Sequence, residues 1–450
     1  MMKMKTIIWL VLLAVAISCK TNLKVLDQDL EIIPTQDAFV VRGEIDQNIL
    51  YKSSNAEEAI NWATEKLSKG GKVFLHKGKY ILHNSLSLPS YTTLEGSGTG
   101  TMLIISENHQ SGNAIVLKGI DKVAIINLVI QSIKDKNVSK TGIILEDCGD
   151  CLVSDVQIVG MKEDGILLSE NTFLSDVKNC RIAACEGSAI RLKQLARGGR
   201  GGDFVTNNID NCTIYQGGYG VYCENALVVN IRDVTVYQSK KPAFYIGNHS
   251  NSVLVSGCRS YQIQDDAIVV NSSHEINISS NIFCWSEGHG IVLNDVRWGT
   301  VSANNIIDNG SINPFERDKD TLIVQGTREF RKMPRTVSDR SSVKSGVIVK
   351  NKTKGVTITG NAVFNWPAAP KMKYGIFEDE TCANNNIISN NINTYELADV
   401  LSQGKGTNVM GNVGFGETPY EGSIGITKLQ YFDLRLIENF IDDFWESTNN

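Results

Sequence analysis

The fold is decided by a short motif that begins at Gly142-Ile-Ile-Leu and returns at Gly165-Ile-Leu-Leu and Ala189-Ile-Arg-Leu. It continues as Gly220-Val-Tyr-Cys, Ala243-Phe-Tyr-Ile, Ala267-Ile-Val-Val, Gly290-Ile-Val-Leu, Gly346-Val-Ile-Val and Gly375-Ile-Phe-Glu. Successive starts lie 23, 24, 31, 23, 24, 23, 56 and 29 residues apart. An interval of 23 or 24 residues, filled with β-branched runs and Asn or Gly turns, is typical of a coil of three short strands. The sequence therefore predicts an all-β chain, a right-handed parallel β-helix.

Two longer intervals indicate insertions into this repeat, at Lys193 to Phe204 and at Asn309 to Lys344. The second insertion contains seven basic residues: Arg317, Arg328, Arg331, Lys332, Arg335, Arg340 and Lys344. Loops that leave a rigid scaffold often build its binding surface, so the basic insertion is a candidate for holding a polyanionic chain. A solvated loop is the alternative.

Cysteine and asparagine recur at the corners of the expected coils. Cys180, Cys212 and Cys258 each precede a strand-like run, which predicts a small apolar ladder inside the coils. Runs such as Asn277 to Asn281 and Asn384-Asn385-Asn386 favour corners with a left-handed backbone, which Asn tolerates. Cys148-x-x-Cys151 has no second pair to complete a zinc site, so no metal is predicted.

Both ends of the repeat have helical signals. Asn55 is placed to cap a helix from Ala56 to Ala63 that stops at Gly70-Gly71 and covers the N-terminal end of the core. Leu429 to Trp445 alternates apolar and acidic residues at helical spacing and is expected to cap the last coil or a neighbouring face, with a partner-binding helix as the alternative. The expected divisions are a signal peptide (1–18), a linker (19–54), the β-helix (55–420) and a helical tail (421–450).

The N-terminus indicates export. A basic start and a short apolar run lead to Ala16-Ile17-Ser18-Cys19, which resembles a bacterial lipobox. The resemblance implies that Cys19 is lipidated and that the chain is anchored in the cell envelope, in the periplasm or on the outer-membrane surface. A plain secretory signal is the alternative. The net charge of −5 gives no electrostatic case for a nucleic-acid partner.

Residues 55–105 resemble the N-terminal segment of the pectate-lyase superfamily, on Lys72 to Leu82, Leu88-Pro89-Ser90 and Leu94 to Gly98. That resemblance implies the β-helix fold and leaves the reaction open.

One pair of adjacent carboxylates stands out in the repeat. Asp265-Asp266 would raise the pKa of one of its members and so supply one acid and one base, as glycoside hydrolysis needs. Asp266 and His289 precede successive motif starts, so they are expected on adjacent coils.

These strings, Asp265-Asp266 and Gly288-His289-Gly290, resemble motifs of the polygalacturonase-like glycoside hydrolases. The resemblance implies that Asp265 is the general acid, that Asp266 takes part in activating water, and that His289 lies beside them. It also implies that Lys350 binds substrate. The family's further acidic motif should fall on Lys240-Lys241-Pro242, so Glu287 or His289 is expected to replace the missing base.

Other outward positions are candidates for sugar contacts. Glu224, Asn248, Asn271, Asn294 and Asp379 lie near one phase of the repeat and are expected to hydrogen-bond sugars. Tyr222, Tyr245 and Phe377 share another phase, which favours either stacking on pyranose rings or stacking that stiffens the coils.

The sequence therefore predicts a carbohydrate-active enzyme, a polygalacturonase-like glycoside hydrolase acting on an acidic polysaccharide without a cofactor. One alternative is a polysaccharide lyase or uronate epimerase, for which Arg191, Lys193 and Lys350 supply basic groups and for which Ca²⁺ would enter only in the lyase case. The other is a polysaccharide-binding β-helix without catalysis.

Overall fold

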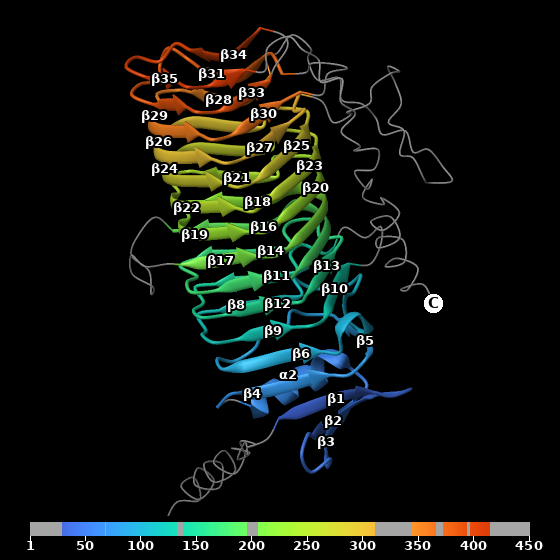
Figure 1. Ribbon diagram of the computed structural model, residues 1–450. Coiled ribbons are helices and arrows are strands. Elements are labelled where there is room, and N and C mark those ends of the chain that lie inside the picture. Colours follow the sequence, from blue (N-terminus) through green and yellow to red (C-terminus); the bar gives the residue numbers. More distant parts are fainter. Residues whose placement is uncertain are drawn as a thin grey trace, which may run out of the picture.

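The computed structural model describes residues 29–67, 69–132, 138–195, 206–310, 344–365, 372–393 and 397–414. Within these ranges the chain winds into coils of three strands, and strands of successive coils pair in parallel. Figure 1 shows the coils stacked from α2 (Ala56–Lys66), in blue, to β34 and β35, in orange-red. The predicted parallel β-helix is confirmed.

Each coil contributes one strand to each of three parallel sheets. Sheet 1 carries the repeated motif and comprises β8 (Ile115–Lys118), β11 (Ile143–Glu146), β14 (Ile166–Glu170), β21 (Phe244–Gly247), β28 (Ser345–Lys350), β31 (Tyr374–Glu378) and β34 (Ala398–Ser402). Sheet 2 comprises β4 (Gly71–Leu75), β6 (Thr92–Gly96), β9 (Ala124–Ile126), β12 (Leu152–Ser154), β15 (Asp176–Lys178), β17 (Asn207–Asp210), β19 (Leu227–Arg232), β22 (Asn251–Ser256), β29 (Lys354–Thr359), β32 (Asn386–Ile388) and β35 (Asn408–Met410).

Sheet 3 follows sheet 2 in every coil. It comprises β5 (Gly78–Leu82), β7 (Thr101–Ile105), β10 (Val129–Ser132), β13 (Gln157–Val159), β20 (Thr235–Ser239), β23 (Arg259–Ile263), β25 (Ile282–Ser286), β27 (Asn305–Ile307), β30 (Ala362–Phe364), β33 (Asn391–Asn393) and β36 (Val413–Gly414). Four long strands turn a corner without a break. β16 (Arg181–Gln194) and β18 (Thr213–Glu224) join sheet 3 to sheet 1, and β24 (Ile268–Ser279) and β26 (Ile291–Ser302) join sheet 1 to sheet 2.

The core is a set of columns, because equal positions of successive coils lie above one another. One inward column of sheet 1 runs through Ile143, Ile166, Ile190, Val221, Phe244, Ile268, Ile291, Val347 and Ile376, all fully buried. The side chains between these alternate to the outside, as the pleat requires. The same register brings outward side chains from distant parts of the sequence together in rows.

A corner column between sheets 2 and 3 changes from cysteine to asparagine along the molecule. Cys180, Cys212 and Cys258 lie buried in it as free thiols, which confirms the predicted ladder. Further along, the side-chain amides of Asn281, Asn304, Asn361, Asn390 and Asn412 hydrogen-bond one to the next, each at 2.9 Å.

The left-handed residues at these corners differ in part from the prediction. Asn384 has φ 54°, as expected, but Ser280 (φ 60°) and Ala303 (φ 54°) take the left-handed conformation beside Asn281 and Asn304. The side chains of Asn281 and Asn304 instead accept hydrogen bonds from buried backbone N–H groups. One of these is the N–H of Cys258, which donates to Asn281 at 2.8 Å.

The N-terminal end is closed as predicted by a capped helix. The Asn55 side chain accepts the backbone N–H of Glu57 at 2.8 Å, and α2 buries Ala59, Ile60 and Ala63 in the core. The prediction of a linker over 19–54 is wrong where the structure describes it. β1 (Leu30–Pro34), β2 (Phe39–Gly43) and β3 (Ile49–Ser53) form an antiparallel unit whose β1 pairs with β4, because alternating apolar residues there extend the core.

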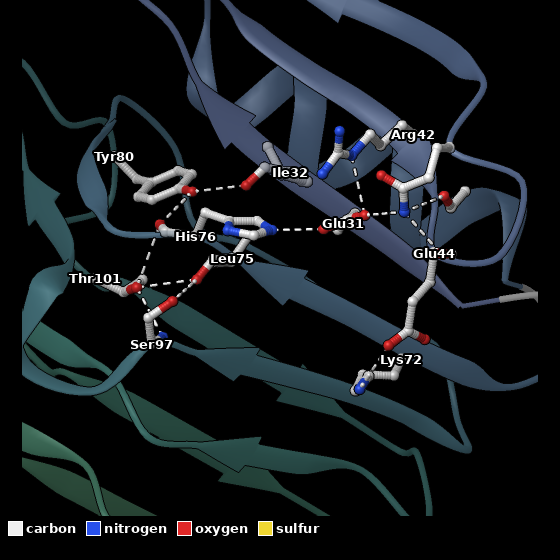
Figure 2. A network of polar contacts seen from close by, with 12 residues as sticks. Glu31, Ile32, Arg42, Glu44, Lys72, Leu75, His76, Tyr80, Ser97 and Thr101 are labelled. Atoms are coloured by element: carbon white, nitrogen blue, oxygen red, sulfur yellow. Dashed lines mark hydrogen bonds and ion pairs between the residues drawn. The ribbon is translucent and has the colours of Figure 1, made fainter.

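A polar network ties this unit to the first coils (Figure 2). The Glu31 carboxylate accepts hydrogen bonds from Arg42 Nε (3.0 Å) and Gln47 Nε2 (2.8 Å) and contacts His76 Nε2 at 2.5 Å. Burial raises the pKa of Glu31, but these three partners outweigh it and hold the pKa below its ordinary value. The carboxylate therefore stays ionised and joins β1, β2 and the residue after β4.

Several predictions concern residues outside the described ranges. They are the signal peptide (1–18) with Cys19, the helix over Leu429 to Trp445 in the tail (421–450), and the basic insertion apart from its first two residues and Lys344. No helix in the described part of the chain is long and apolar enough to cross a membrane.

Candidate functional site

Asp265, Asp266 and His289 lie at the corner between sheets 3 and 1, on two successive coils. Asp265 and Asp266 join β23 to β24, and His289 occupies the equivalent turn between β25 and β26. Asp266 Oδ1 accepts the backbone N–H of His289 at 2.6 Å. The predicted placement of Asp266 and His289 on adjacent coils is confirmed.

The same contact recurs along this corner column. His289 Nδ1 accepts the backbone N–H of Ser345 in the next coil at 3.0 Å, and Asp164 Oδ1 accepts that of Ser188 at 2.7 Å. A buried backbone N–H needs an acceptor, and at these coils a side chain of the preceding coil supplies it. Asp266 and His289 therefore have an architectural role in addition to any chemical one.

This hydrogen bond fixes the state of the His289 ring. Because Nδ1 accepts the Ser345 N–H, the neutral ring carries its proton on Nε2. Burial, with the positive charges of Lys344 and Lys350, lowers the pKa of His289 to about 3, so the ring is neutral at physiological pH. His289 can donate a hydrogen bond through Nε2 but offers no acceptor there for a proton.

Asp265 differs from its neighbour because, among the described residues, its carboxylate bonds within its own turn and not to the next coil. Its Oδ1 accepts the N–H of Asp266 at 2.9 Å, within the same turn. Burial raises the pKa of Asp265, and the negative charge of Asp266 adds to this rise, whereas the hydrogen bond from the Asp266 N–H and the charges of Lys241 and Lys344 oppose it. Burial also raises the pKa of Asp266. Asp265 is thus a partly buried acid that holds its proton more tightly than a free aspartate.

Lysines flank this acid along the axis of the molecule. The same position in successive coils, three residues before a paired residue of sheet 1, is occupied by Lys241, Asp265, Gly288 and Lys344. Gly288 has no room for a side chain, since a Cβ there would lie 2.1 Å from Asp266 Oδ1. The corner therefore presents a carboxyl group with a basic residue on one side and, beyond a gap at Gly288, a second basic residue on the other.

Lys350 and Asn271 lie in one outward column of sheet 1, beside this corner. The column runs from Asn271 through Asn294 to Lys350. Asn294 Nδ2 donates to Asn271 Oδ1 at 2.5 Å, and Asn271 Nδ2 donates to Tyr245 Oη at 3.5 Å. The two predicted contact residues Asn271 and Tyr245 thus touch each other.

Glu287 and the other polar candidates lie nearby. Glu287 precedes Gly288 in the turn of His289, and its N–H donates to the Ile263 carbonyl at 2.8 Å. Glu224 shares the column of Asn271 and accepts from Asn248 Nδ2 at 3.0 Å.

The tyrosines of sheet 1 stack along the molecule. The rings of Tyr222 and Tyr245 are parallel within 9°, with centroids 4.8 Å apart, and the guanidinium of Arg191 lies 4.8 Å from the Tyr222 centroid on the coil before it. Both faces of Tyr222 are thus occupied by protein groups. The expected stacking on pyranose rings has no free face there, and the stack serves the alternative role of stiffening the coils.

Arg191 is engaged by two carboxylates. Its terminal nitrogens lie 3.6 Å from Asp164 Oδ2 and 3.7 Å from Glu224 Oε2. Its charge is therefore largely balanced within the protein.

A metal centre has no support in the described part of the chain. No group of three or more His, Cys, Asp or Glu residues there is arranged to hold an ion. Cys148 and Cys151 are buried free thiols.

Comparisons with known proteins bear on the fold. The family model for the right-handed β-helix region matches residues 201–415. The chain is a right-handed parallel β-helix protein. The resemblance of residues 55–105 implied this fold, and the stacked parallel coils confirm the fold.

The solved structures that match this β-helix protein agree with the family model on its fold. The A-module of mannuronan C-5 epimerase AlgE6 from Azotobacter vinelandii matches with a TM-score of 0.64 at 14% identity, over 81% of this chain and 96% of that one. The AlgE4 A-module of the same organism matches with a TM-score of 0.54 at 13% identity, over 80% and 96%. The tailspike protein of E. coli bacteriophage HK620, in complex with a pentasaccharide, matches with a TM-score of 0.54 at 10% identity, over 82% and 77%. No curated protein matches the sequence.

Sequence reasoning missed two features of the β-helix corner. Lys241 and Lys344 were noted only as a replaced motif and as part of an insertion, whereas the structure places both in the column of Asp265. Asp164 precedes the motif start at Gly165 as Asp266 precedes Ala267, and only the structure shows that both make the same hydrogen bond to the next coil. Counting back two residues from each motif start would have found the lysine column.

Proposed function

We propose that this chain is an enzyme that acts on an acidic polysaccharide and that Asp265 is its general acid. The observation that carries the proposal is the Asp265 corner, a partly buried carboxyl group with a raised pKa and with Lys241 and Lys344 in its own column. A raised pKa keeps an acid protonated nearer to neutral pH, and lysines suit the carboxylates of a uronate chain.

The proposed reaction is polygalacturonase-like hydrolysis. Asp265 gives its proton to the glycosidic oxygen as the bond to the anomeric carbon breaks. Water adds to that carbon and loses a proton to a carboxylate, for which Asp266 or Glu287 are the nearby groups. His289 donates a hydrogen bond from Nε2 to a substrate oxygen, and Lys350, Asn271 and Tyr245 line the adjoining part of sheet 1.

A polysaccharide lyase or uronate epimerase is the second candidate. The observation that favours it is that Asp266 Oδ1 is already committed to the backbone of His289, which leaves Asp265 as the freer carboxylate of the pair. Lysines at this corner would neutralise the uronate carboxylate and so acidify the proton at C5. The structural neighbours that are mannuronan C-5 epimerases support the same substrate class. Ca²⁺ would take part only in the lyase reaction.

One assay separates these reactions. The purified chain is incubated with pectic, alginate and sulfated polysaccharides while reducing ends, ultraviolet absorbance of unsaturated uronate and exchange of the C5 hydrogen with solvent deuterium are followed. Reducing ends without absorbance indicate hydrolysis, absorbance indicates elimination, and deuterium uptake without cleavage indicates epimerisation. Binding without any of these signals would replace the proposal with the non-catalytic β-helix, as the pentasaccharide on the tailspike illustrates for sugar binding on such a fold.

We further propose that Cys19 is lipidated and anchors the protein in the bacterial envelope. The support is the sequence from Ala16 to Cys19 after a basic and apolar start. Mass spectrometry of the mature N-terminus should find a diacylated or triacylated Cys19, and an unmodified residue there would contradict the anchor.

A further inference from the structure

The beginning of sheet 2 presents a row of basic side chains on its outer face. In one outward column, Arg297 of β26 pairs with His274 of β24 and with Lys354 of β29. The column continues through Ala383 to Lys405. Arg297, Lys354 and Lys405 are exposed and His274 is partly exposed, and we call these four residues the basic row. Figure 1 shows β24, β26 and β29 stacked in order along the left flank of the molecule.

The charges of the basic row are left for solvent. Among the residues that the structure describes, no carboxylate lies within ion-pair distance of Arg297, Lys354 or Lys405. Glu275 and Asp295 stand next to the row in the sequence, and neither pairs with these cations. The whole chain has a net charge of −5, so a row of cations without ion pairs is a local exception that suits an anionic ligand.

A tryptophan stands beside this row in an unfavourable conformation. Trp298 follows Arg297 and has φ 54°, in the left-handed region that bulky side chains rarely adopt. The indole packs on Gly355 of the next coil, where a Cβ would lie 3.1 Å from Trp298 Cδ1, and the residue is still 59% exposed. Backbone strain and exposure in one large aromatic residue point to a function of its ring. The equivalent left-handed residues of the neighbouring coils are small or polar: Ser252, Glu275, Gly355, Asn384 and Gly406.

Tyr91 shows an exposed aromatic residue whose surroundings differ. It is also 59% exposed and has φ 66°. Lys122 Nζ lies 5.8 Å from the centroid of its ring and 3.9 Å from Asp150 Oδ2. The tyrosine ring and its cation are therefore engaged with other groups of the protein, whereas Trp298 and the cations beside it face solvent.

We propose that Arg297, Trp298 and Lys354 form a second carbohydrate-binding surface, which holds an acidic polysaccharide along the axis of the molecule. The indole stacks on the apolar face of a uronate ring, and the two cations pair with carboxylates of that sugar and its neighbours. Successive coils are about 4.8 Å apart, so the row offers cations at regular steps along an extended chain.

The class of ligand rests on the proposed function, but the surface is separate from the proposed chemistry. Asp265 and Asp266 precede β24, whereas His274 lies in its second half and Arg297 in that of β26. The strands of sheet 1 thus lie between the Asp265 corner and the basic row. The surface binds a part of the polymer that is not being cleaved or altered.

The test is affinity electrophoresis in gels that contain polygalacturonate or alginate, with every variant made in the Asp265→Asn chain so that the polymer is not consumed. Trp298→Gly should raise the apparent Kd several-fold because it removes the stacking ring. It should not lower the melting temperature, since glycine suits a left-handed backbone. Arg297→Gln with Lys354→Gln should also raise the Kd several-fold, and added salt should shrink that difference.

Matched controls remove the same groups elsewhere. Tyr91→Gly removes an equally exposed ring at a left-handed position, and Lys122→Gln with Lys162→Gln removes two lysines that pair with Asp150 and Glu186. Both should bind the polymer like the parent chain.

Three results would overturn the surface. One is unchanged binding in Trp298→Gly and in the double variant. Another is a lower melting temperature of Trp298→Gly with intact binding, which would make the tryptophan structural. The third is equal retardation by duplex DNA that does not depend on Trp298, which would reduce the row to a general anion patch.

This surface and the proposed enzyme can fail separately. Binding that depends on Trp298, without any product from the wild-type chain, would keep the surface and remove the enzyme. Product formation together with binding that is insensitive to these variants would keep the enzyme and remove the surface.

Discussion

The corners at Asp164 and at Asp266 are the same place in the fold, four coils apart, yet only one is a candidate for chemistry. Both aspartates accept a backbone N–H from the next coil, at 2.7 and 2.6 Å, and burial raises the pKa of both. Asp164 is balanced by Arg191 at 3.6 Å and follows Glu163, whereas Asp266 follows Asp265, whose column supplies Lys241 and Lys344. The aspartate at each corner therefore has a structural role, and at the second corner the residue before it, Asp265, is the proposed general acid.

The largest expected effect is on catalytic efficiency, and it distinguishes Asp265 from Glu163, the residues that precede these two aspartates. Asp265→Asn should lower kcat/KM by about 10²- to 10⁴-fold, the usual contribution of a general acid, while Glu163→Gln at the equivalent position should leave it unchanged. The measurement is the initial rate on the polysaccharide that the assay panel identifies. Equal losses in both variants would remove the distinction between the corners.

The two corner aspartates, Asp164 and Asp266, should contribute equally to the stability of the fold. Asp164→Ala and Asp266→Ala should each lower the free energy of unfolding by about 1–3 kcal/mol, because each leaves a buried N–H without an acceptor. Asparagine at either position keeps an acceptor oxygen and should cost less. Urea denaturation followed by circular dichroism measures both, and a loss confined to Asp266 would show that the shared hydrogen bond is not what stabilises the corner.

The lysines should affect substrate binding more than turnover. Lys241→Gln and Lys344→Gln are each expected to raise KM for a uronate polymer several-fold with little change in kcat, and added salt should shrink the difference by screening. Lys118→Gln provides a control, since Lys118 is paired with Glu146 at 2.5 Å in an earlier coil. An unchanged KM at low salt in both variants would argue against an acidic substrate.

The smallest effect is a dependence of stability on pH. The folded-state pKa of Asp265 is raised, so its contribution to stability is full below the unfolded value of about 3.9 and is lost as pH rises through the folded value. Asp265→Asn should therefore melt like the wild type in acid and at a higher temperature at neutral pH. A lower melting temperature at neutral pH would contradict the inferred burial of this carboxyl.

Much of the fold could be predicted because its signals recur. The motif at Gly142, Gly165 and Ala189 fixes the coil length, and Asn55 marks the start of α2 by a local hydrogen bond. The strands from Leu30 to Ser53 could not be predicted from the repeat because they precede it and pair antiparallel.

The site was predictable in position more than in role. The phase of the repeat placed Asp266 and His289 on adjacent coils, but which atom of each side chain bonds to the backbone depends on rotamers that a sequence does not specify. The column of Tyr222 and Tyr245 was also predicted. The sequence could not show that the two rings stack face to face, or that Arg191 packs on the other face of Tyr222.

The most direct measurement of the central claim is a crystal structure of the Asp265→Asn variant with a bound oligosaccharide of the identified substrate. We expect a glycosidic oxygen within hydrogen-bond distance of the substituted side chain at position 265, uronate carboxylates beside Lys241 and Lys344, and Asp266 still bonded to the His289 N–H. An oligosaccharide bound on another sheet, with the Asp265 corner empty, would contradict the claim.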